Sequence, residues 1–443
     1  MRMQLTAIAE CAAGRLVGHD VEVHGLCHDS RKVRPGDLFV ALPGERCDGH
    51  DFAAAATERG AAAVLVARAL GVDVPQVIVA DPRLAMGQIA ADWRARLAVT
   101  VVGITGSNGK TTVKEMTAAV LAAAGPTAAT PGNYNNEIGV PLTLARLTEA
   151  HRYAAIEMGE ARPGDITYLA DMARPLIGVI TNAGPAHLET MGSLEGVART
   201  TGELLAALPA DGTAVINADD RFADFWRRLA APRRTISFGI DTEADVRGIP
   251  EQGRLRIVMA EGEVSFRPAL PGRHNLLNAL AALAVARALE IPLDAAIGRL
   301  ERMTGLPGRL QVRHHARGWT LVDDTYNANP ASLYAGLQVL AELGGERWLV
   351  LGDMAELGPD TDKLHAEMGQ AAADLGVRRL FCLGPVSRYS CEAFGPGATH
   401  FDSHRALLEA LTGQIHAGVN CLVKGSRSMA MEQIVSGLLG GTD

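Results

Sequence analysis

The sequence has few aromatic residues and no paired cysteine motif. Phe, Trp and Tyr make up 4% of its 443 residues while hydrophobic residues reach 48%, so the core must be built from Ala, Leu, Val and Ile. None of the six cysteines forms a C-x-x-C pair, which argues against a zinc ribbon or a redox motif. Scattered thiols without a signal peptide are typical of a reducing compartment, and we expect a cytoplasmic protein.

Long apolar runs and an excess of basic charge are also missing. The most apolar stretch, residues 61–74, is interrupted by Arg68 and Asp73 and falls short of the ~18 residues of a membrane span. The net charge of −8 argues against nucleic acid as the main partner, although a local basic site can still bind phosphates. The sequence does not specify an oligomeric state, and we expect a monomer.

The hydrophobic pattern predicts an α/β fold. Residues 1–82 form a small unit in which short apolar strands flank an Ala-rich helix at 52–63. A second unit follows, with near-continuous apolar runs typical of buried parallel strands. A loop-rich stretch is expected from about 239 to 273, before a helix at 276–289. The predicted strands of these two units lie at 38–42, 64–67, 77–80, 98–105, 153–158, 176–181 and 213–217.

A third alternation of strands and helices begins after the sequence "GLPGR" at 305–309. Its strands each end in a small residue, which predicts a second doubly wound sheet with ligand-binding loops at the carboxyl ends of the strands. The predicted strands of this unit lie at 319–326, 347–353, 378–384 and 420–426.

One segment, "VVGITGSNGKTTVKEM" at 101–116, has the composition of a phosphate-binding loop. The strict motif G-x-x-x-x-G-K-[ST] would place a glycine at Ile104, yet Gly109-Lys110-Thr111 is intact and Gly106 supplies a second flexible point. Backbone N–H groups after a strand can cradle phosphate oxygens, Lys110 would neutralise their charge, and Thr111 would reach Mg²⁺. The simpler interpretation is a Gly-rich turn capped by threonine. The expected nucleotide contacts are Gly106, Ser107, Asn108, Gly109, Lys110, Thr111 and Thr112.

This loop and several further segments resemble the Mur ligases, the ATP-dependent amino-acid-adding enzymes of bacterial cell-wall synthesis. The segment "HDSRKVRPGDLFVALPGERCDGHDF" is similar to the family's uridine-nucleotide-binding domain. The other matching segments, in order along nearly the whole chain, are "TPGNYNNEIGVP", "GRHNLLNALAA", "DDTYNANP", "LGDMAELG" and "VKGSR". The resemblance implies an α/β, three-domain Mur ligase architecture with a central P-loop-type parallel sheet and a C-terminal Rossmann-like domain.

The resemblance also implies a division of labour between the domains. Residues 1–82 would bind the UDP substrate, 83–312 would bind ATP, and 313–443 would bind a dipeptide. The substrates would be UDP-N-acetylmuramoyl-tripeptide and D-alanyl-D-alanine, with ATP and Mg²⁺ as cofactors. A peptide bond at neutral pH requires an activated carboxylate, here an acyl phosphate, and metal ions must screen the charges brought together.

Three other functions are alternatives for this sequence. The sibling ligase that adds the third residue has a "YAHTP"-like segment and a "DNPR" signature, whereas this sequence has "YNANP" and no "DNPR". Folylpolyglutamate synthase lacks the "DSR…PGDLFVAL" first domain. A nucleotide-dependent switch that binds without ligating is a different class, and two separate substrate domains argue against it.

The expected catalytic residues are Lys110, Glu157, His187 and Arg309. Glu157 closes a predicted strand, where a metal-binding carboxylate would lie, although a surface salt bridge has the same sequence pattern. His187 matches the family's magnesium-binding histidine, and the alternative is a structural histidine. Arg309 resembles the arginine that reaches the γ-phosphate from the domain junction, where it would stabilise charge. The expected metal ligands are Thr111, Glu157 and His187.

The sequence departs from the family fourteen residues after His187. A lysine that is often carbamoylated stands there in these ligases, whereas this chain has Thr201. Arg199 is close but cannot form a carbamate. Either the protein manages without the group, or a neighbour such as Glu203 supplies the negative charge.

The remaining site residues are those that match the family's binding motifs in this sequence. Nucleotide contacts would come from two asparagines three residues apart, which can share a helical face, and from the "DDTYNANP" segment. A capping and a buried asparagine, and turn chemistry at "DD", are the respective alternatives. A solvated turn is the alternative at "KGSR", where a bidentate Arg427 is best suited to a carboxylate. The residues are Asn275, Asn278, Asp324, Tyr326 and Asn327 for the nucleotide, Ser30, Arg31, Asn135 and Asn136 for the UDP substrate, and Lys424 and Arg427 for the dipeptide.

Overall fold

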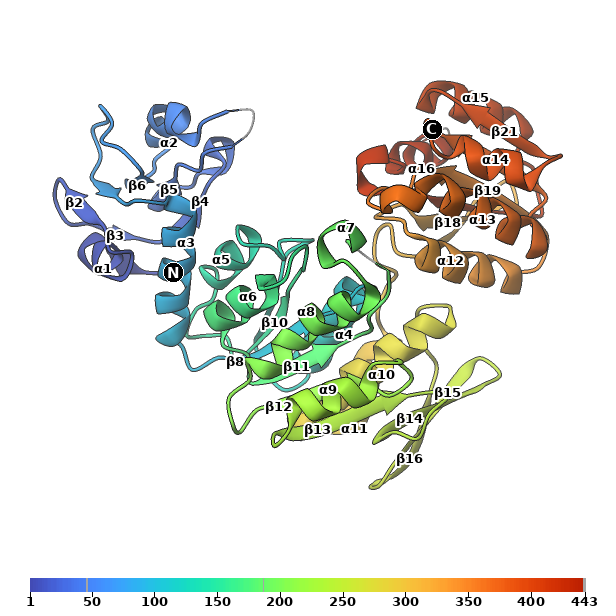
Figure 1. The fold of residues 1–443 in the computed structure, drawn as a ribbon, viewed down its shortest axis with the longest axis horizontal. Helices are drawn as coiled ribbons and strands as arrows, with labels where there is room; N and C mark the ends of the chain where they lie inside the picture. Colours follow the sequence, from blue (N-terminus) through green and yellow to red (C-terminus); the bar gives the residue numbers. More distant parts are fainter. Residues whose placement is uncertain (45–46, 186, 441–443) are drawn as a thin grey trace.

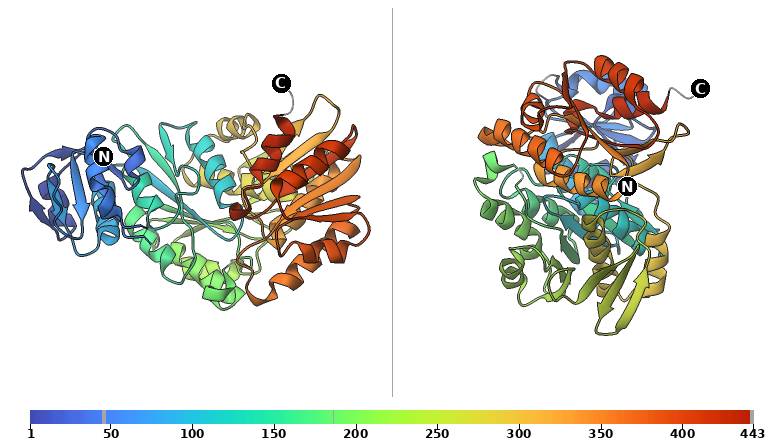
Figure 2. Two further views of the ribbon diagram at one scale, coloured as in Figure 1. Left: turned by 90° about the horizontal axis from the view of Figure 1, so that it is seen from above. Right: turned by 90° about the vertical axis from the view of Figure 1, so that its right-hand side faces the viewer.

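The computed structural model describes residues 1–44, 47–185 and 187–440. Three α/β units, each built on its own sheet, lie in a row along the long axis, with the N-terminal and C-terminal units at opposite ends (Figures 1 and 2). The predicted α/β class with parallel sheets is confirmed. Within the described part of the chain, no helix combines the length and the apolar character needed to cross a membrane.

The N-terminal unit contains a five-stranded sheet that is parallel except for its edge strand β2. The three predicted apolar strands are its central members, and they are buried because helices cover them. The predicted helix at 52–63 is shorter, since Gly60 at φ 101° ends it early. The elements are β1 (Met3–Gln4), α1 (Leu5–Cys11), β2 (Arg15–Val17), β3 (Glu22–Val23), β4 (Gly25–Cys27), β5 (Asp37–Val40), α2 (Ala53–Glu58), β6 (Ala63–Val66) and β7 (Gln76–Ile78).

Helix α3 (Pro82–Ala95) joins the first two units. Its start is fixed by Asp81, whose side chain accepts hydrogen bonds from two backbone N–H groups of the first turn, and by Pro82 at the first helical position. Met86 and Ile89 pack into the core of the N-terminal unit, whereas Ala90 packs into the core of the middle unit. The helix therefore gives the two sheets a shared, rigid connection.

The middle unit is a nine-stranded sheet covered by helices on both faces. Helices α4, α10 and α11 cover one face, and α5, α6, α8 and α9 cover the other (Figure 1). The strands, in spatial order, are β16 (Gly262–Phe266), β15 (Arg254–Met259), β14 (Val246–Glu251), β13 (Arg234–Gly239), β12 (Thr213–Asn217), β11 (Ile177–Ile180), β8 (Thr100–Thr105), β10 (Tyr153–Glu157) and β9 (Thr127–Ala129). The helices are α4 (Lys110–Leu121), α5 (Gly139–Leu144), α6 (Asp165–Ala173), α7 (Leu188–Met191), α8 (Leu194–Ala206), α9 (Ala223–Ala230), α10 (Arg273–Ala288) and α11 (Leu293–Glu301).

The prediction of a loop-rich stretch at 239–273 is wrong, because strands β14, β15 and β16 lie within these residues. These strands alternate buried and exposed residues, since only one face is covered, and the continuous apolar signal of the other strands is missing. Pro250 is tolerated because β13 pairs only with the first two residues of β14, so no ladder partner lies on that side. Gly253, at φ 67°, makes the tight turn between β14 and β15.

The C-terminal unit is a six-stranded sheet in which only β17 runs antiparallel. All four predicted strands are present, and helices cover both faces. The elements are β17 (Gln311–His314), β18 (Thr320–Asp324), α12 (Pro330–Glu342), β19 (Glu346–Gly352), α13 (Thr361–Asp374), β20 (Arg379–Leu383), α14 (Arg388–Phe394), β21 (Ala398–Phe401), α15 (His404–Gln414), β22 (Val419–Lys424) and α16 (Glu432–Leu439).

Candidate functional site

A cavity of about 830 Å³ lies where the carboxyl ends of the middle strands meet the loops of the C-terminal sheet. Most of the predicted site residues line it, although they come from distant parts of the sequence. They are Ser107, Asn108, Gly109, Lys110, Thr111, Thr112, Asn135, Asn136, Glu157, His187, Asn275, Asn278, Arg309, Asp324, Tyr326, Asn327, Lys424 and Arg427. Gly106 belongs to the same loop, whereas Ser30 and Arg31 lie in the N-terminal unit, away from this cavity.

The loop between β8 and α4 explains its unusual glycine spacing. Ile104 is a fully buried residue inside β8, so no turn is needed there. The chain turns at Gly106, where φ is 133° and a Cβ would approach Thr181 Oγ1 to 2.2 Å. It turns again at Gly109, where φ is 82° and a Cβ would meet the side chain of Asn278 at 2.6 Å. Both positions therefore require glycine.

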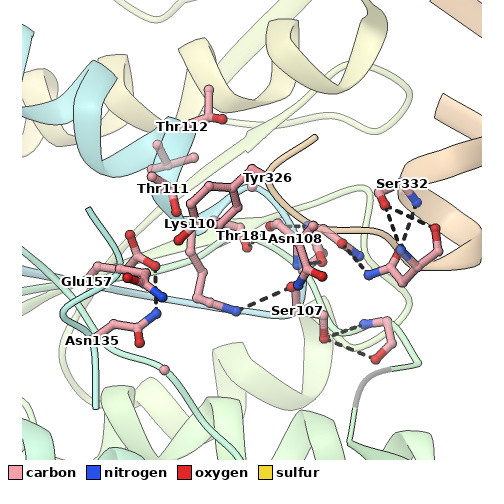
Figure 3. A pocket seen from close by; sticks show the side chains of 18 of the residues that line it. Ser107, Asn108, Lys110, Thr111, Thr112, Asn135, Glu157, Thr181, Tyr326 and Ser332 are labelled. Carbon is pink, nitrogen blue, oxygen red and sulfur yellow. Dashed lines mark hydrogen bonds between the residues drawn. The ribbon is translucent and has the colours of Figure 1, made fainter. Parts of the chain in front are cut away.

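The segment that follows strand β11 braces this loop through polar groups that the sequence did not single out. Asn108 N donates to Asn182 Oδ1 (3.0 Å), and Asn108 O accepts from Thr181 Oγ1 (2.7 Å) and Asn182 Nδ2 (3.0 Å). Ser107 Oγ donates to the Gly184 carbonyl at 3.0 Å (Figure 3). The loop is thus preorganised before any ligand arrives.

Lys110 begins helix α4 and folds back over the loop. Its ammonium donates to the carbonyls of Gly106 and Ser107, the latter at 3.3 Å. Neither partner is charged, and the side chain is only partly buried. The positive charge of Lys110 therefore remains available to an anion in the cavity.

Arg309 reaches from the junction with the C-terminal unit to the start of α4. Its Nη2 donates to Thr111 Oγ1 at 3.0 Å, and its guanidinium lies 3.9 Å from the centre of the Tyr326 ring. Its Nε is buried and has no hydrogen-bond partner among the described residues. Burial raises the pKa of Tyr326, so the ring stays neutral beside this cation. Arg309 retains a free donor for a phosphate oxygen.

Glu157 ends strand β10 at the floor of the cavity, with 1% of its surface exposed. Asn135 Nδ2 donates to one carboxylate oxygen at 2.8 Å (Figure 3). Thr130 Oγ1 accepts the Glu157 N–H at 2.9 Å. The other oxygen, Oε2, is buried without a partner in the described chain. A buried carboxylate oxygen with no donor suits a hard cation such as Mg²⁺.

His187 lies after β11, with a backbone φ of 50°. Its Nδ1 lies 3.2 Å from Glu356 Oε2, which comes from the loop after β19. Across the described residues, no group of three or more His, Cys, Asp or Glu side chains is already arranged around a cation position. The assignment of Thr111, Glu157 and His187 as metal ligands therefore stays a prediction.

Thr201 and Glu203 have different surroundings from those the sequence suggested. Glu203 caps helix α6, accepting from the backbone N–H groups of Gly164 (2.8 Å) and Thr167 (3.0 Å), and it does not line the cavity. Thr201 is fully buried and contacts Glu160, a cavity residue that sequence reasoning missed. Burial raises the pKa of Glu160 to about 7.

This raised pKa predicts a pH-dependent cost to folding. Between about pH 4.5 and 7 the folded Glu160 holds a proton that the unfolded chain has released, so stability falls as pH rises through this window. The metal-free Glu160→Gln protein should therefore gain stability relative to wild type above pH 7, by up to roughly 3 kcal/mol, and not below pH 4.5. Thermal unfolding in chelator at pH 4.5 and 8 measures this, and an equal difference at both values would contradict it.

The two asparagines of α10 face the loop. Asn278 Nδ2 donates to Asn275 Oδ1 at 3.1 Å, and Asn275 Nδ2 donates to the Pro271 carbonyl at 2.7 Å. Neighbouring His274 also lines the cavity, and burial lowers its pKa to about 4, so the ring is neutral at pH 7. The pair therefore presents a neutral, polar edge next to the phosphate loop.

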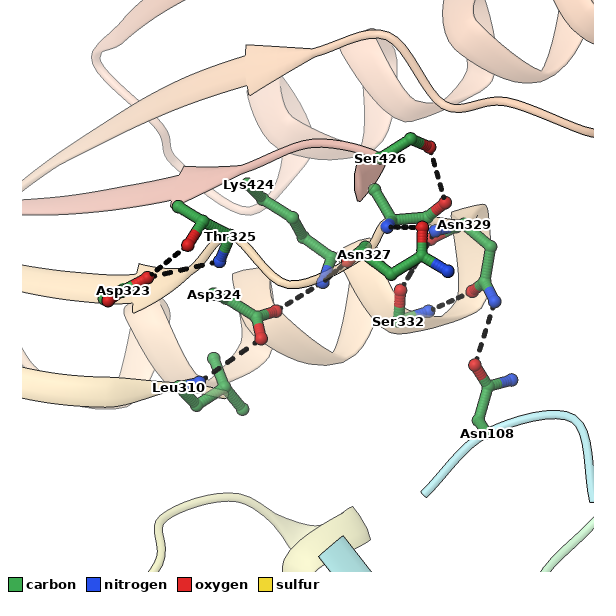
Figure 4. Close-up of polar contacts among 11 residues, drawn as sticks. Asn108, Leu310, Asp323, Asp324, Thr325, Asn327, Asn329, Ser332, Lys424 and Ser426 are labelled. Carbon is green, nitrogen blue, oxygen red and sulfur yellow. Dashed lines mark hydrogen bonds and ion pairs between the residues drawn. The ribbon is translucent and has the colours of Figure 1, made fainter. Parts of the chain in front are cut away.

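Lys424 and Asp324, at the ends of β22 and β18, form a buried ion pair (Figure 4). Asp324 also accepts the Leu310 N–H at 3.2 Å, and Lys424 donates to the Asn327 carbonyl at 3.0 Å. Burial raises the pKa of Asp324 and lowers that of Lys424, while each charge stabilises the other. The Lys424 charge is thus already compensated inside the protein.

Arg427 and Arg31, the other two predicted carboxylate- or phosphate-binding cations, lie nearer the surface. Arg427 Nη1 lies 3.0 Å from Glu432, with 61% of its side chain exposed. Arg31 bonds the carboxylate of Asp29 through Nε (2.9 Å) and Nη2 (3.0 Å). Their assignments to the dipeptide and to the UDP substrate stay predictions.

Asn329 connects the C-terminal unit directly to the phosphate loop. Its side chain caps α12 through Ser332 N (2.8 Å) and also donates to Asn108 Oδ1 at 2.8 Å (Figure 4). The sequence signal was an asparagine before a proline, which marks a helix start. The contact to Asn108, 221 residues away, has no signal in the sequence.

The sequence is similar to known protein families and to individual proteins over nearly its whole length. Three family profiles match in order: "Mur ligase family, catalytic domain" at 22–94, "Mur ligase middle domain" at 104–286 and "Mur ligase, glutamate ligase domain" at 308–427. The UDP-N-acetylmuramoyl-tripeptide–D-alanyl-D-alanine ligase of Escherichia coli K12 is 42% identical, with 98% of each chain covered.

Solved structures agree in fold. The crystal structure of MurF from Acinetobacter baumannii superposes with a TM-score of 0.92 at 32% identity, covering 99% of each chain. The MurF ligase from Thermotoga maritima, solved in complex with ADP, gives a TM-score of 0.83 at 28% identity and covers 94% of this chain and 97% of its own. The three-unit architecture is therefore shared along the whole length of these proteins.

Proposed function

The chain belongs to the Mur ligase family, and on that premise we propose that it joins D-alanyl-D-alanine to UDP-N-acetylmuramoyl-tripeptide, using ATP. The product is UDP-N-acetylmuramoyl-pentapeptide, the last peptidoglycan precursor made in the cytoplasm. The observation that carries the proposal is that a phosphate loop, a buried carboxylate and a junction arginine line one cavity. The whole-chain likeness to the Escherichia coli enzyme supports the choice of substrates.

The reaction needs two bond exchanges. The terminal carboxylate of the tripeptide attacks the γ-phosphorus of ATP, so the bond to ADP breaks and an acyl phosphate forms. The amine of D-alanyl-D-alanine then attacks the acyl carbon, phosphate leaves, and the amine loses a proton as the C–N bond forms. Both steps concentrate negative charge, and positioned cations stabilise it.

The residues of the cavity suit these demands. Lys110 and the N-terminus of α4 would hold the β- and γ-phosphates, and the free Nε of Arg309 would contact the transferring group. Glu157, with Thr111 and His187, would hold Mg²⁺, which screens the phosphate charge when bound. Asn275 and Asn278 would contact the adenine, with Asp324, Tyr326 and Asn327 at the far side of the nucleotide. Ser30, Arg31, Asn135 and Asn136 would bind the UDP substrate, and Lys424 and Arg427 the dipeptide.

The proposal extends to the division of the chain and its setting. Residues 1–82, 83–312 and 313–443 serve the UDP substrate, the ATP and the dipeptide, respectively. The protein works in the cytoplasm as a monomer, without nucleic-acid partners. Sedimentation of the purified protein at micromolar concentration tests the monomer.

The deciding experiment measures phosphate release and the muramoyl peptide product together. With ATP, Mg²⁺ and both substrates, we expect stoichiometric phosphate and pentapeptide, and omission of either peptide substrate should remove both signals. Phosphate release that is indifferent to the peptides would instead identify a nucleotide-dependent switch. Replacing D-alanyl-D-alanine with single amino acids distinguishes the sibling ligases.

We also predict that the C-terminal unit moves during the reaction. Its contacts with the middle unit include the polar ones of Asn329 with Asn108 and of Glu356 with His187, which can exchange for contacts with bound nucleotide. Small-angle scattering should show a smaller radius of gyration when ATP analogue and UDP substrate are both present. An unchanged scattering profile under saturating ligands would contradict the movement.

A further inference from the structure

Glu160 is a cavity residue for which the scheme above has no role. It lies three residues beyond the predicted metal ligand Glu157, in the turn after β10, and only 6% of its surface is exposed. It lines the same cavity as Lys110 and His187. A buried carboxylate in such a place requires a hydrogen-bonding or charged partner.

The described residues give Glu160 little compensation. Its hydrogen-bond partner is Thr201, whose Oγ1 lies 3.0 Å from both carboxylate oxygens. The same hydroxyl lies 2.8 Å from the Val197 carbonyl, and one hydroxyl has a single hydrogen to donate. Most of the acceptor capacity of Glu160 is therefore unused among the residues that the structure describes.

The surrounding charges point to a cation. Lys110 is the positive group that favours the ionised form of Glu160, whereas Glu203 and Asp165 oppose it, and burial opposes it most. A cation bound near Lys110 and Glu157 would tip this balance toward the carboxylate. Glu160 is thus placed to respond to, and to strengthen, cation binding in the cavity.

Thr201 and Glu160 also fit each other in size. Thr201 is fully buried on α8 and its hydroxyl contacts the Glu160 carboxylate directly, so a longer side chain at 201 would need the space that Glu160 fills. Position 201, which holds a lysine in many family members, therefore holds a short residue here. The negative charge is instead supplied by Glu160, which contacts Thr201.

We propose that Glu160 is a positioning residue for the cation of the reaction: held by Thr201, its carboxylate supplies a second fixed negative charge beside Glu157. The inference rests on the proposed ligase function, in which Mg²⁺ accompanies ATP. It replaces the earlier suggestion of Glu203, whose carboxylate is occupied at the N-terminus of α6.

The test measures metal binding directly. Mn²⁺ and ADP are titrated into the full-length protein, and water-proton relaxation reports the protein-bound Mn²⁺–ADP complex. Glu160→Gln, which keeps the shape and removes the charge, should weaken Mn²⁺ binding roughly ten- to a hundred-fold, as loss of groups around metal ligands does. Glu203→Gln is the matched control and should bind Mn²⁺ at least as tightly as wild type does, because the Glu203 charge opposes ionisation of Glu160.

Further variants test the inference in case Glu160→Gln does not fold. If Glu160→Gln does not fold, Thr201→Val, which removes only the hydroxyl, should weaken Mn²⁺ binding several-fold, while Thr201→Ser should not. Wild-type affinity in Glu160→Gln, or in Thr201→Val if that variant carries the test, would overturn the inference, as would an equal loss in Glu203→Gln. Failure of the wild-type protein to bind Mn²⁺–ADP would instead count against the proposed function.

Discussion

Replacing Lys110 with alanine should lower the rate of ligation at least about a thousand-fold while leaving the protein folded. The ammonium lies over the loop, where it donates to the carbonyls of Gly106 and Ser107, and it forms no ion pair with a carboxylate among the described residues. Without it, the negative charge of the transferring phosphoryl group loses one of the two fixed cations proposed to stabilise it. Single-turnover phosphate transfer, measured at saturating ATP, isolates this step from binding.

Lys363→Ala provides the control for Lys110→Ala. Lys363 is 72% exposed on α13, where it makes a surface pair with Glu367 at 3.8 Å, and it does not line the cavity. The same chemical change there should leave turnover within about two-fold of wild type, because exposed pairs contribute little. Substantial turnover in folded Lys110→Ala would remove the loop from the mechanism.

Replacing Asp324 with alanine should destabilise the C-terminal unit by about 3–5 kcal/mol, because Lys424 would remain buried without a counter-charge. Lys424 has 2% and Asp324 10% of its side chain exposed, so water cannot replace the lost partner. Hydrogen exchange at the amides of β18 and β22 measures the loss locally, which avoids treating a chain of several units as two-state.

The double variant Asp324→Ala/Lys424→Met separates this cause from simple loss of packing. Removing both charges leaves an apolar pair, which should recover at least half of the lost stability. A double variant no more stable than Asp324→Ala would show that the stranded charge is not the cause. Loss of ligation in the stable double variant would then report on the catalytic roles predicted for these residues.

The parts of the fold that could be predicted from the sequence are those with a strong local residue pattern. Strands β8, β10, β11 and β12 are buried on both faces and therefore read as continuous apolar runs. The loop after β8 was also located, because glycine, lysine and threonine at that spacing combine turn geometry with phosphate chemistry. These signals are local, so one sequence suffices to find them.

The features that the sequence missed depend on long-range contacts. Strands β14 to β16 have one exposed face, so their polar residues and Gly253 resemble a loop. Glu160 has no motif of its own, and its importance appears only when α8 brings Thr201 to within 3.0 Å. The ion pair of Lys424 with Asp324 also has no signal in the sequence, because it requires the pairing of β18 with β22.

Two of the bonds at the junction between the C-terminal unit and the middle unit end on the nucleotide loop. Arg309 holds the hydroxyl of Thr111 at 3.0 Å, and Asn329 holds the side chain of Asn108 at 2.8 Å. A ligand that binds to either of these loop side chains competes with the bond between the two units. By thermodynamic linkage, the free energy by which the ligand weakens docking of the C-terminal unit equals the free energy by which docking weakens ligand binding. Altering Asn329, which lies on the C-terminal unit, should consequently shift nucleotide affinity from a distance, and nucleotide should shift the docking equilibrium in return.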